Sequence, residues 1–436
     1  NIYIRRKLLK HMKTYNKIFK YFLLFSFPLF FIACSDDDDA VTEIPVETPA
    51  TYDFSRDGQN TVSFSGQTAR LNHVDALYKL LNYNTPNATD GSFSNDPAAP
   101  YFTSYADLNK MYSSGDFGTI LPTLNGSGKN VGGKTAAGCA TQGDAGVRED
   151  LRKVLENFAT LTGNIAGHDA TAAAGSAGKL VYKDGVKYIQ IDGNGHEFDQ
   201  IFVKGLIGAL TLDQIVNNYL DPCKLDGDGY RDNNDNKVNA TGKSYTDMEH
   251  KWDEGFGYLY GQEADYTRAD LGTAPLGNGN LLMKYFKKIN ADQTSGSKAG
   301  EPMGPMVFEA FKRGRAAIVA GNYEVRDQQA AIIKIQLSKI IGFKAVDYLN
   351  SYVSQMGNSD RGYAYHALSE GYGFIMSLQF TNDGKGSPYF TTAQVDAMLA
   401  DISDFWALDD GNGNVTTAAK AKIDAHVASI KSAFGI

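Results

Sequence analysis

The chain has 436 residues, 42% of them apolar, which is more than one ordinary hydrophobic core encloses. Residues 1–33 carry seven Lys or Arg and no acid, so the remainder holds 35 basic against 50 acidic residues, a formal charge of −15. Nucleic-acid binding requires a basic surface, so this balance argues against a nucleic-acid partner.

Residues 1–33 have the pattern of an export signal with a spurious N-terminal extension. Met12 is the first Met, so we expect residues 1–11 to be translated upstream sequence. A basic stretch to Lys20 is followed by an uncharged apolar run over 21–33. This run is too short to cross roughly 30 Å of hydrocarbon as a permanent helix.

The next segment resembles the lipidation signal of bacterial lipoproteins. Residues 31–34 read Phe-Ile-Ala-Cys, and a small residue before Cys is typical of a lipobox, so we expect Cys34 to be acylated. The following Ser-Asp-Asp-Asp-Asp resembles the surface-export signal of Bacteroidota lipoproteins; the alternative is a solvated acidic spacer. We therefore expect an outer-membrane lipoprotein exposed at the cell surface.

Cys139 and Cys223 are the other cysteines of the chain. Outside the cytoplasm a pair of thiols is usually oxidised, which predicts a Cys139–Cys223 disulfide. The alternative is two unpaired thiols.

Residues 34–64 are predicted to be a lipid anchor and flexible tether, extended over 40–62. A first helical half is expected over 65–262. Apolar spacing predicts helices after Ser65 and over 147–161, and residues 115–145 form a Gly-rich loop. Alternation over 180–191 around Lys-Asp-Gly predicts one β-hairpin.

Helical periodicity after the hairpin predicts two further segments of the first half, at about 196–220 and 245–262. A second helical half is expected over 263–436, with segments at about 279–290, 303–321, 325–356, 363–380, 392–406 and 416–433. Pro-Tyr-Phe-Thr occurs at 100–103 and 388–391, where Thr103 and Thr391 are expected N-caps. The predicted fold is mostly α, with one small β-hairpin.

One internal repeat indicates a duplication. Residues 250–258 and 366–374 both read His-x-x-x-Glu-Gly-aromatic-Gly-aromatic. A fainter pair precedes them, Phe-Val-Lys-Gly at 202–205 and Phe-Lys-Arg-Gly at 311–314. We interpret this order as two pseudo-symmetric helical bundles.

The lipobox, the acidic signal and the duplicated His/Glu/Gly helix together resemble an uncharacterised family of Bacteroidota surface lipoproteins. That family is similar to the imelysin-like proteins of iron uptake. The resemblance implies an all-α two-bundle fold and a binding role beside an outer-membrane transporter. The imelysin mark Gly-x-His-x-x-Glu is absent from both repeats, because His250 and His366 each lie four residues before a Glu.

His250 and Glu254, and likewise His366 and Glu370, lie on one helical face at i, i+4. If the two helices face one another, two imidazoles and two carboxylates converge into a site for Zn, Fe or Mn. The alternative is that the neighbouring glycines permit close helix packing and that His and Glu are hydrogen-bonded buried groups.

Three further patterns resemble ligand sites. Asp226, Asp228, Asp232 and Asp235 resemble part of a calcium loop, the alternative being a solvated Asp/Asn-rich loop. His-Glu-Phe-Asp-Gln at 196–200 begins like a zinc-protease motif, but Gln200 replaces the second His, so a helix start is predicted. The P-loop pattern at 128–135 lacks a preceding strand, so no nucleotide is expected.

Three functions remain open from the sequence. The first is a non-catalytic binding component of iron, haem or other metal uptake. The second is a metal-dependent, imelysin-like peptidase. The third is a structural or glycan-binding surface protein.

Overall fold

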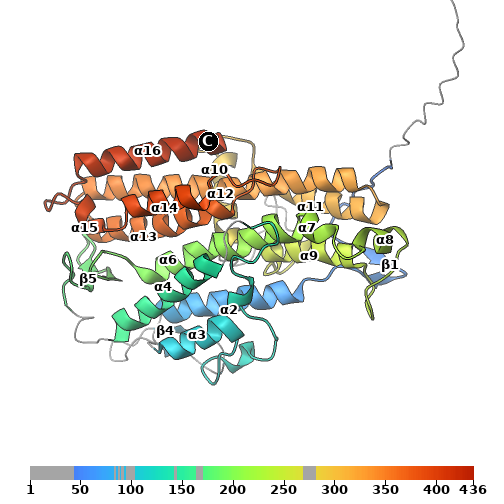
Figure 1. The fold of residues 1–436 in the computed structure, drawn as a ribbon, viewed down its shortest axis with the longest axis horizontal. Coiled ribbons are helices and arrows are strands. Elements are labelled where there is room, and N and C mark those ends of the chain that lie inside the picture. Colours follow the sequence, from blue (N-terminus) through green and yellow to red (C-terminus); the bar gives the residue numbers. More distant parts are fainter. Residues whose placement is uncertain are drawn as a thin grey trace, which may run out of the picture. The chain divides into compact units, whose positions relative to one another are not determined.

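The computed structural model describes residues 44–82, 85–86, 89, 93–94, 104–141, 145–163, 170–268 and 281–436. Residues 44–436 form one compact, mostly helical unit (Figure 1). The predictions for 1–33 and Cys34 lie outside the described residues, whereas the N-cap predicted at Thr103 is wrong, because Ser104 caps the helix at 105–114. None of the helices in the described ranges combines the length and apolar character needed to span a membrane.

The first part of the body contains the predicted helices and hairpin, with additional short strands. In chain order its elements are β1 (Ser55–Arg56), β2 (Gln59–Asn60), α2 (Ser65–Asn82), β3 (Thr85–Pro86), β4 (Phe93–Ser94), α3 (Tyr105–Ser114), α4 (Ala145–Gly163), β5 (Gly178–Val181) and β6 (Tyr188–Ile191). The described part of the predicted Gly-rich loop, 115–141, contains the 3₁₀ turns η1 (Pro122–Leu124) and η2 (Gly132–Lys134) and no helix longer than these.

The second part contains the later helices that periodicity predicts and, at 222–225 and 230–235, two short helices that it does not predict. They are α6 (Phe198–Leu206), continued by the π-helical turns η3 (Ile207–Leu212) and η4 (Ile215–Tyr219), then α7 (Pro222–Leu225), α8 (Tyr230–Asp235), α9 (Asp247–Tyr260), α10 (Leu281–Thr294), α11 (Met303–Ala320), α12 (Tyr323–Gly357), α13 (Arg361–Ser377), α14 (Thr392–Asp401), α15 (Phe405–Leu408) and α16 (Thr417–Phe434). Thr391 is the N-cap of α14, in a capping box with Gln394. Asp404 caps a new helix at 405, which splits the predicted 392–406 segment into two.

The helical run at 198–219 lies at the centre of the body. Every residue from 197 to 221 is buried, so this run has no solvent face. Its α6 end packs on α4 and α13, whereas its η4 end packs on α9. The predicted halves 65–262 and 263–436 therefore interlock and do not separate into two compact units.

The predicted hairpin is confirmed. Strands β5 and β6 pair in antiparallel register with Leu180 opposite Ile189. Gly185 takes the left-handed φ of 71° that the turn requires, and Asp184 accepts hydrogen bonds from the amides of Val186 and Lys187. The ring of Tyr182 stacks on Tyr363, which holds the hairpin against the start of α13.

The predicted extended, flexible tether does not hold for 44–64, because β1 and β2 pair across a turn and the segment packs on the body. Tyr52 is fully buried, its ring stacks on Phe256 at 3.7 Å, and its hydroxyl donates to Asp253 at 2.7 Å. Asn322 donates to the carbonyl of Ile44. Aromatic burial of this size outweighs the chain entropy of a free linker, so residues 44–64 belong to the folded body.

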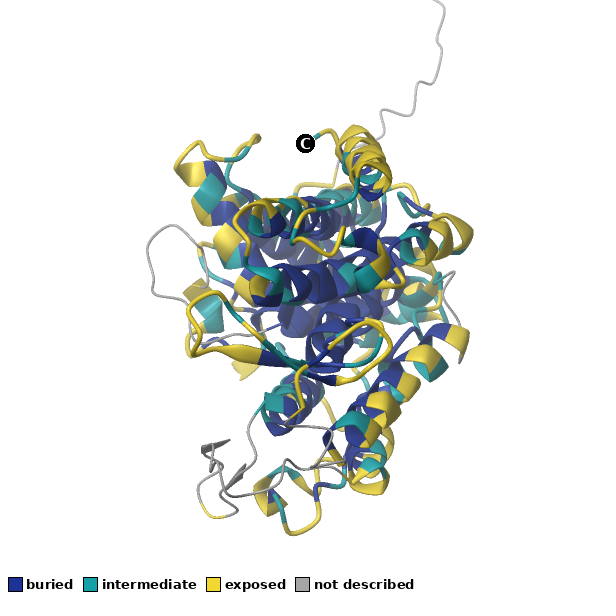
Figure 2. Ribbon diagram, turned by 90° about the vertical axis from the view of Figure 1, so that its left-hand side faces the viewer, coloured by how far each residue is buried: buried dark blue, intermediate teal, exposed yellow. Residues whose placement is uncertain are grey.

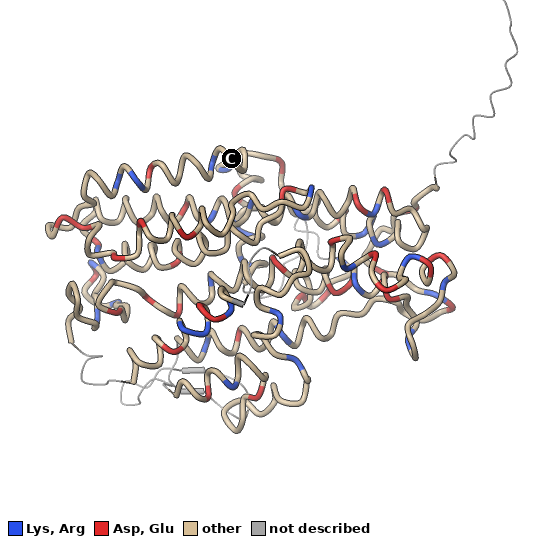
Figure 3. Tube along the Cα trace, viewed as in Figure 1, with Lys and Arg blue, Asp and Glu red and all other residues tan. Residues whose placement is uncertain are grey.

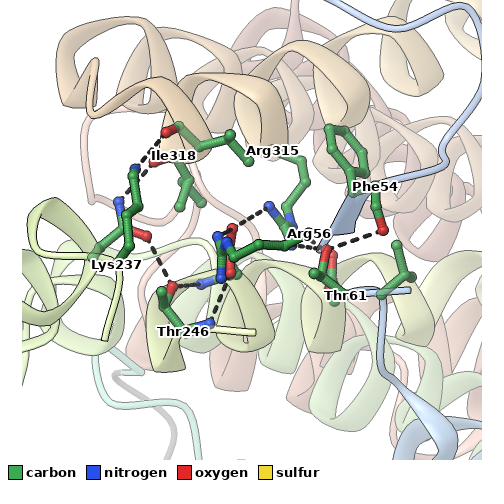
Figure 4. A network of polar contacts seen from close by, with 12 residues as sticks. Phe54, Arg56, Thr61, Lys237, Thr246, Arg315 and Ile318 are labelled. Atoms are coloured by element: carbon green, nitrogen blue, oxygen red, sulfur yellow. Dashed lines mark hydrogen bonds and ion pairs between the residues drawn. The ribbon is translucent and has the colours of Figure 1, made fainter. Parts of the chain in front are cut away.

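A fully buried ion network fixes this segment to α9 and α11 (Figure 4). Arg315 has no solvent exposure and contacts Glu249 and Asp253, each at 3.1 Å, and it also donates to Thr61. Burial would raise the pKa of Glu249, but Arg315 and Arg56 hold it below its ordinary value. The network therefore keeps its charges only while Arg315 is present.

We predict that Arg315→Met lowers the free energy of unfolding by about 3–5 kcal/mol, because it leaves buried Asp253 without its cation and Glu249 with Arg56 alone. Arg231→Met is the matched control, since Arg231 is 46% exposed and pairs with Asp226; we expect a loss of less than about 1 kcal/mol. Urea unfolding followed by circular dichroism measures both. Equal losses in the two variants would show that the buried network adds nothing to stability.

Cys139 and Cys223 are joined by a disulfide, with Cα atoms 6.2 Å apart and a sequence separation of 84. The bond links the Gly-rich loop to α7. It closes a long loop, so it restricts the unfolded chain strongly.

We predict that the double variant Cys139→Ser/Cys223→Ser loses about 2–4 kcal/mol of unfolding free energy. A reductant should shift the urea midpoint of the wild-type protein and leave that of the double variant unchanged. Titration of thiols in the denatured, unreduced wild-type protein should detect none at these positions; two reactive thiols would contradict the disulfide.

Candidate functional site

A cleft of about 470 Å³ lies between the hairpin, the end of α2, α4 and the start of α6. Its lining includes the aromatic side chains of Tyr78, Phe158, Tyr182 and Tyr188. Figure 2 looks onto this end of the body and shows the partly exposed hairpin in front of buried helices. The volume and aromatic lining are typical of a small-molecule site.

Buried polar groups complete the lining of the cleft. Glu197, Asp199, Gln200 and His366 all line it, and the first three have less than 9% of their surface exposed. Gln200 donates to Asp199 at 2.6 Å and accepts from Lys204 at 2.5 Å. The cleft therefore has an apolar and an oriented polar side.

Behind this polar side lies a cluster of Glu197, His366, Glu370 and Lys204, which we call the carboxylate–imidazolium cluster. His366 Nδ1 donates to Glu197 Oε2 at 2.7 Å, and Nε2 lies 3.6 Å from Glu370 Oε2. Lys204 Nζ contacts Glu370 Oε1 at 3.0 Å, and the hydroxyl of Tyr348 donates to the same oxygen. Two anions thus balance two cations.

The pKa shifts follow from these contacts. Burial would lower the pKa of His366, but Glu197 and Glu370 outweigh it and raise the pKa to about 9. Burial would likewise raise the pKa of Glu370, but Lys204 and His366 hold it below its ordinary value. For Asp199 burial prevails, reinforced by Glu197, and raises the pKa to about 7. His366 is consequently an imidazolium at neutral pH.

Local sequence explains why these groups meet. Glu197 occupies the N-cap position of α6, and its amide donates to Ser369 Oγ on α13. A Cβ at Gly373 would lie only 2.5 Å from the Cβ of Lys204, so α6 and α13 approach closely only with glycine there. The expected structural role of the repeat glycines, close helix approach, is confirmed at this position.

The second His–Glu pair has different surroundings. His250 Nδ1 lies 3.0 Å from the carbonyl of Ser63, and Nε2 lies 3.9 Å from Glu254. Glu254 instead accepts from Lys251 and Gln67, each at 2.8 Å. Burial therefore prevails over Glu254 and lowers the pKa of His250.

The structure does not bring the two pairs together into one metal site. α13 packs at the Glu197 end of the central run, whereas Gly255 on α9 faces Tyr219 and Leu220 at its other end. These ends are separated by roughly 30 Å at about 1.5 Å per residue. Among the described residues, the one group with metal-ligand spacing is Cys139, Asp221 and Cys223, and its two sulfurs are already joined.

The calcium pattern is also satisfied by protein groups. Asp226 contacts Arg231 and Arg326, which overcome burial and lower its pKa to about 2. Asp235 accepts from the hydroxyl of Tyr323. Asp228 lies at the turn before α8, whereas Asp232 and Asp235 lie within that helix, so the four carboxylates do not form a ligand loop.

Sequence reasoning named His366 and Glu370 but missed the other polar residues around them. Glu197 and Gln200 were visible in the 196–200 pattern, and the predicted helix start is confirmed there by α6. Lys204 was visible in the Phe-Val-Lys-Gly echo. A charged residue inside a continuous apolar helix signals a buried partner, but it does not identify Glu370.

The His366 pKa predicts a pH-dependent stability. An unfolded histidine titrates near 6.5, so the imidazolium stabilises the fold fully below that pH and this contribution is lost as the pH rises to about 9. We expect a fall of about 2–3 kcal/mol in the free energy of unfolding across this window. His366→Gln should remove this fall in urea unfolding, whereas His250→Gln, with a lowered folded-state pKa, should retain it. Parallel pH profiles for wild type and His366→Gln would contradict the imidazolium.

Comparison with known proteins places the chain in one family. A family model described as Domain of unknown function (DUF4856) matches residues 49–436, so the match begins within the packed segment before α2. No curated protein and no solved structure matches the chain. The match carries no information on the imelysin-like resemblance of the sequence. The chain belongs to the DUF4856 family.

Proposed function

We propose that this chain is an outer-membrane-anchored, non-catalytic binding protein whose cleft takes a small saccharide. The anchor rests on the lipobox-like residues ending at Cys34 and on the acidic run after it. The ligand class rests on the cleft, and the observation that carries it is the combination of aromatic side chains with charge-balanced polar groups in one lining.

A neutral ligand suits the carboxylate–imidazolium cluster. Glu197 and Glu370 are matched by His366 and Lys204, so the cluster offers no net charge to an ion. The polar lining of the cleft does offer acceptors on Glu197 and Asp199 and both donors and acceptors on Gln200. Sugar hydroxyls donate and accept, and the apolar faces of sugar rings pack on aromatic rings such as Tyr78 and Tyr188.

Metal carriage, the first expectation from the sequence, is less well supported by the same geometry. A metal binds the neutral imidazole lone pair, but both nitrogens of His366 face carboxylates and its pKa is raised to about 9. At neutral pH a metal would first have to displace the imidazole proton of His366, which Glu197 and Glu370 stabilise.

We predict that the purified chain binds defined members of a printed array of mono-, di- and oligosaccharides. Glu197→Gln should weaken the binding of those sugars at least about tenfold in isothermal titration calorimetry, because it removes a carboxylate that lines the cleft. Glu254→Gln is the control, since Glu254 is an ion-paired glutamate that lies outside the cleft. Its affinity should equal that of the wild type.

The metal alternative is measured on the same variants. Stoichiometric Zn or Fe after dialysis, lost in His366→Ala, together with no sugar bound, would replace the saccharide proposal by metal carriage. Equal sugar affinity in wild type and Glu197→Gln would remove this cleft from the proposal.

We also infer that the body is a duplicated, imelysin-like pair of pseudo-symmetric bundles whose elements are exchanged. Each Phe-x-x-Gly helix packs on the His–Glu helix of the other repeat, α6 on α13 and α11 on α9. At each crossing a glycine permits the approach, Gly373 against Lys204 and Gly314 against Trp252. A duplication in which each repeat packs its Phe-x-x-Gly helix on the His–Glu helix of the other repeat would produce the interlocked body.

A further inference from the structure

The hairpin and the adjoining start of α13 together carry more than half of the exposed large apolar side chains of the described body. Seven large apolar side chains are exposed among the described residues, and four of them cluster here: Val181, Val186, Tyr188 and Tyr363. Val186 is 79% exposed. Single exposed apolar residues are ordinary, but a cluster around the mouth of a cleft marks a contact surface.

The same hairpin is basic, although the chain beyond residue 33 carries a formal charge of −15. It carries Lys179, Lys183 and Lys187 against the single acid Asp184 between its strands. Lys183 Nζ donates to the backbone carbonyl of Asn358, Lys187 forms no ion pair with any described acidic residue, and Lys179 Nζ lies 4.6 Å from the ring centre of Tyr188. Elsewhere acidic and basic residues are interspersed along the helices (Figure 3). An anionic partner is therefore attracted at the hairpin.

This surface is continuous with the cleft. Val186, Lys187 and Tyr188 belong to the exposed hairpin and also line the cleft. A flat membrane surface or a globular protein would cover the hairpin without entering the cleft, whereas a flexible polymer occupies both.

We propose that the hairpin is a second subsite, at which an acidic polysaccharide containing uronic acid or sulfated residues continues out of the cleft. Its sugar rings pack on Tyr188 and Tyr363, and its acidic groups pair with Lys183 and Lys187. The proposal rests on the saccharide-binding function proposed above and adds the charge of the ligand.

The test compares polygalacturonate, heparin and neutral dextran as probes, with phosphatidylglycerol vesicles as a fourth arm. Binding to the immobilised full chain is measured by biolayer interferometry at low and high NaCl. We expect the acidic polymers to bind, dextran to bind more weakly, and the affinity for the acidic polymers to fall as salt screens the lysines. Lys183→Gln/Lys187→Gln should lose on the order of tenfold in that affinity.

The matched control is Lys420→Gln/Lys422→Gln, which removes the same charge from exposed positions on α16 and should leave binding unchanged. Circular dichroism verifies that both double variants fold. If sugars bind in a Glu197-dependent way without preference for acidic polymers, the second subsite is overturned and the cleft function stands. If neither sugars nor polymers bind, both proposals fail. Lysine-dependent binding to the vesicles alone would assign the hairpin to a membrane surface instead.

Discussion

The central helical run at 198–219 has no solvent face, so every charge that it carries must be satisfied inside the protein. Lys204 meets this requirement through Glu370 on α13. Asp213 meets it through the amide of Gly138 and the side chains of Thr141 and Asn217, while burial still raises its pKa to about 6. These contacts fix α13 on one side of the run and the Gly-rich loop on the other. An unpaired charge at either position would cost several kcal/mol.

The same constraint explains why one sequence motif produces two different sites. A His and a Glu at i, i+4 leave one imidazole nitrogen for a third group. For His366 that group is the carboxylate of Glu197, which favours the imidazolium; for His250 it is the carbonyl of Ser63, which cannot supply a full charge. The helix repeat therefore supplies the scaffold, and the segment packed against each helix decides its protonation.

Sequence periodicity located the helices because each has an apolar face, and the hairpin because its alternation surrounds a Gly turn. Two aspects depended on contacts between distant segments, which periodicity does not encode. Residues 44–64 have the composition of a linker, yet Tyr52 and Thr61 are held by Asp253 and Arg315. Likewise, the similarity of the repeats suggested that His250 and His366 converge. Their helices instead pack at opposite ends of the central helical run, and the length of that run keeps the two histidines apart.

In the proposed binding, the cluster and the hairpin use different electrostatics. The Glu197–His366 pair is largely shielded from solvent and already oriented, so a neutral hydroxyl that accepts or donates there requires little further desolvation of either charge. Lys183 and Lys187 are exposed, so their attraction acts over about 10 Å and weakens with salt. Exposed charges of this kind mainly raise the association rate, whereas oriented buried groups determine which ligand dissociates slowly. A ligand that is acidic along its length and neutral at the unit inside the cleft satisfies both requirements.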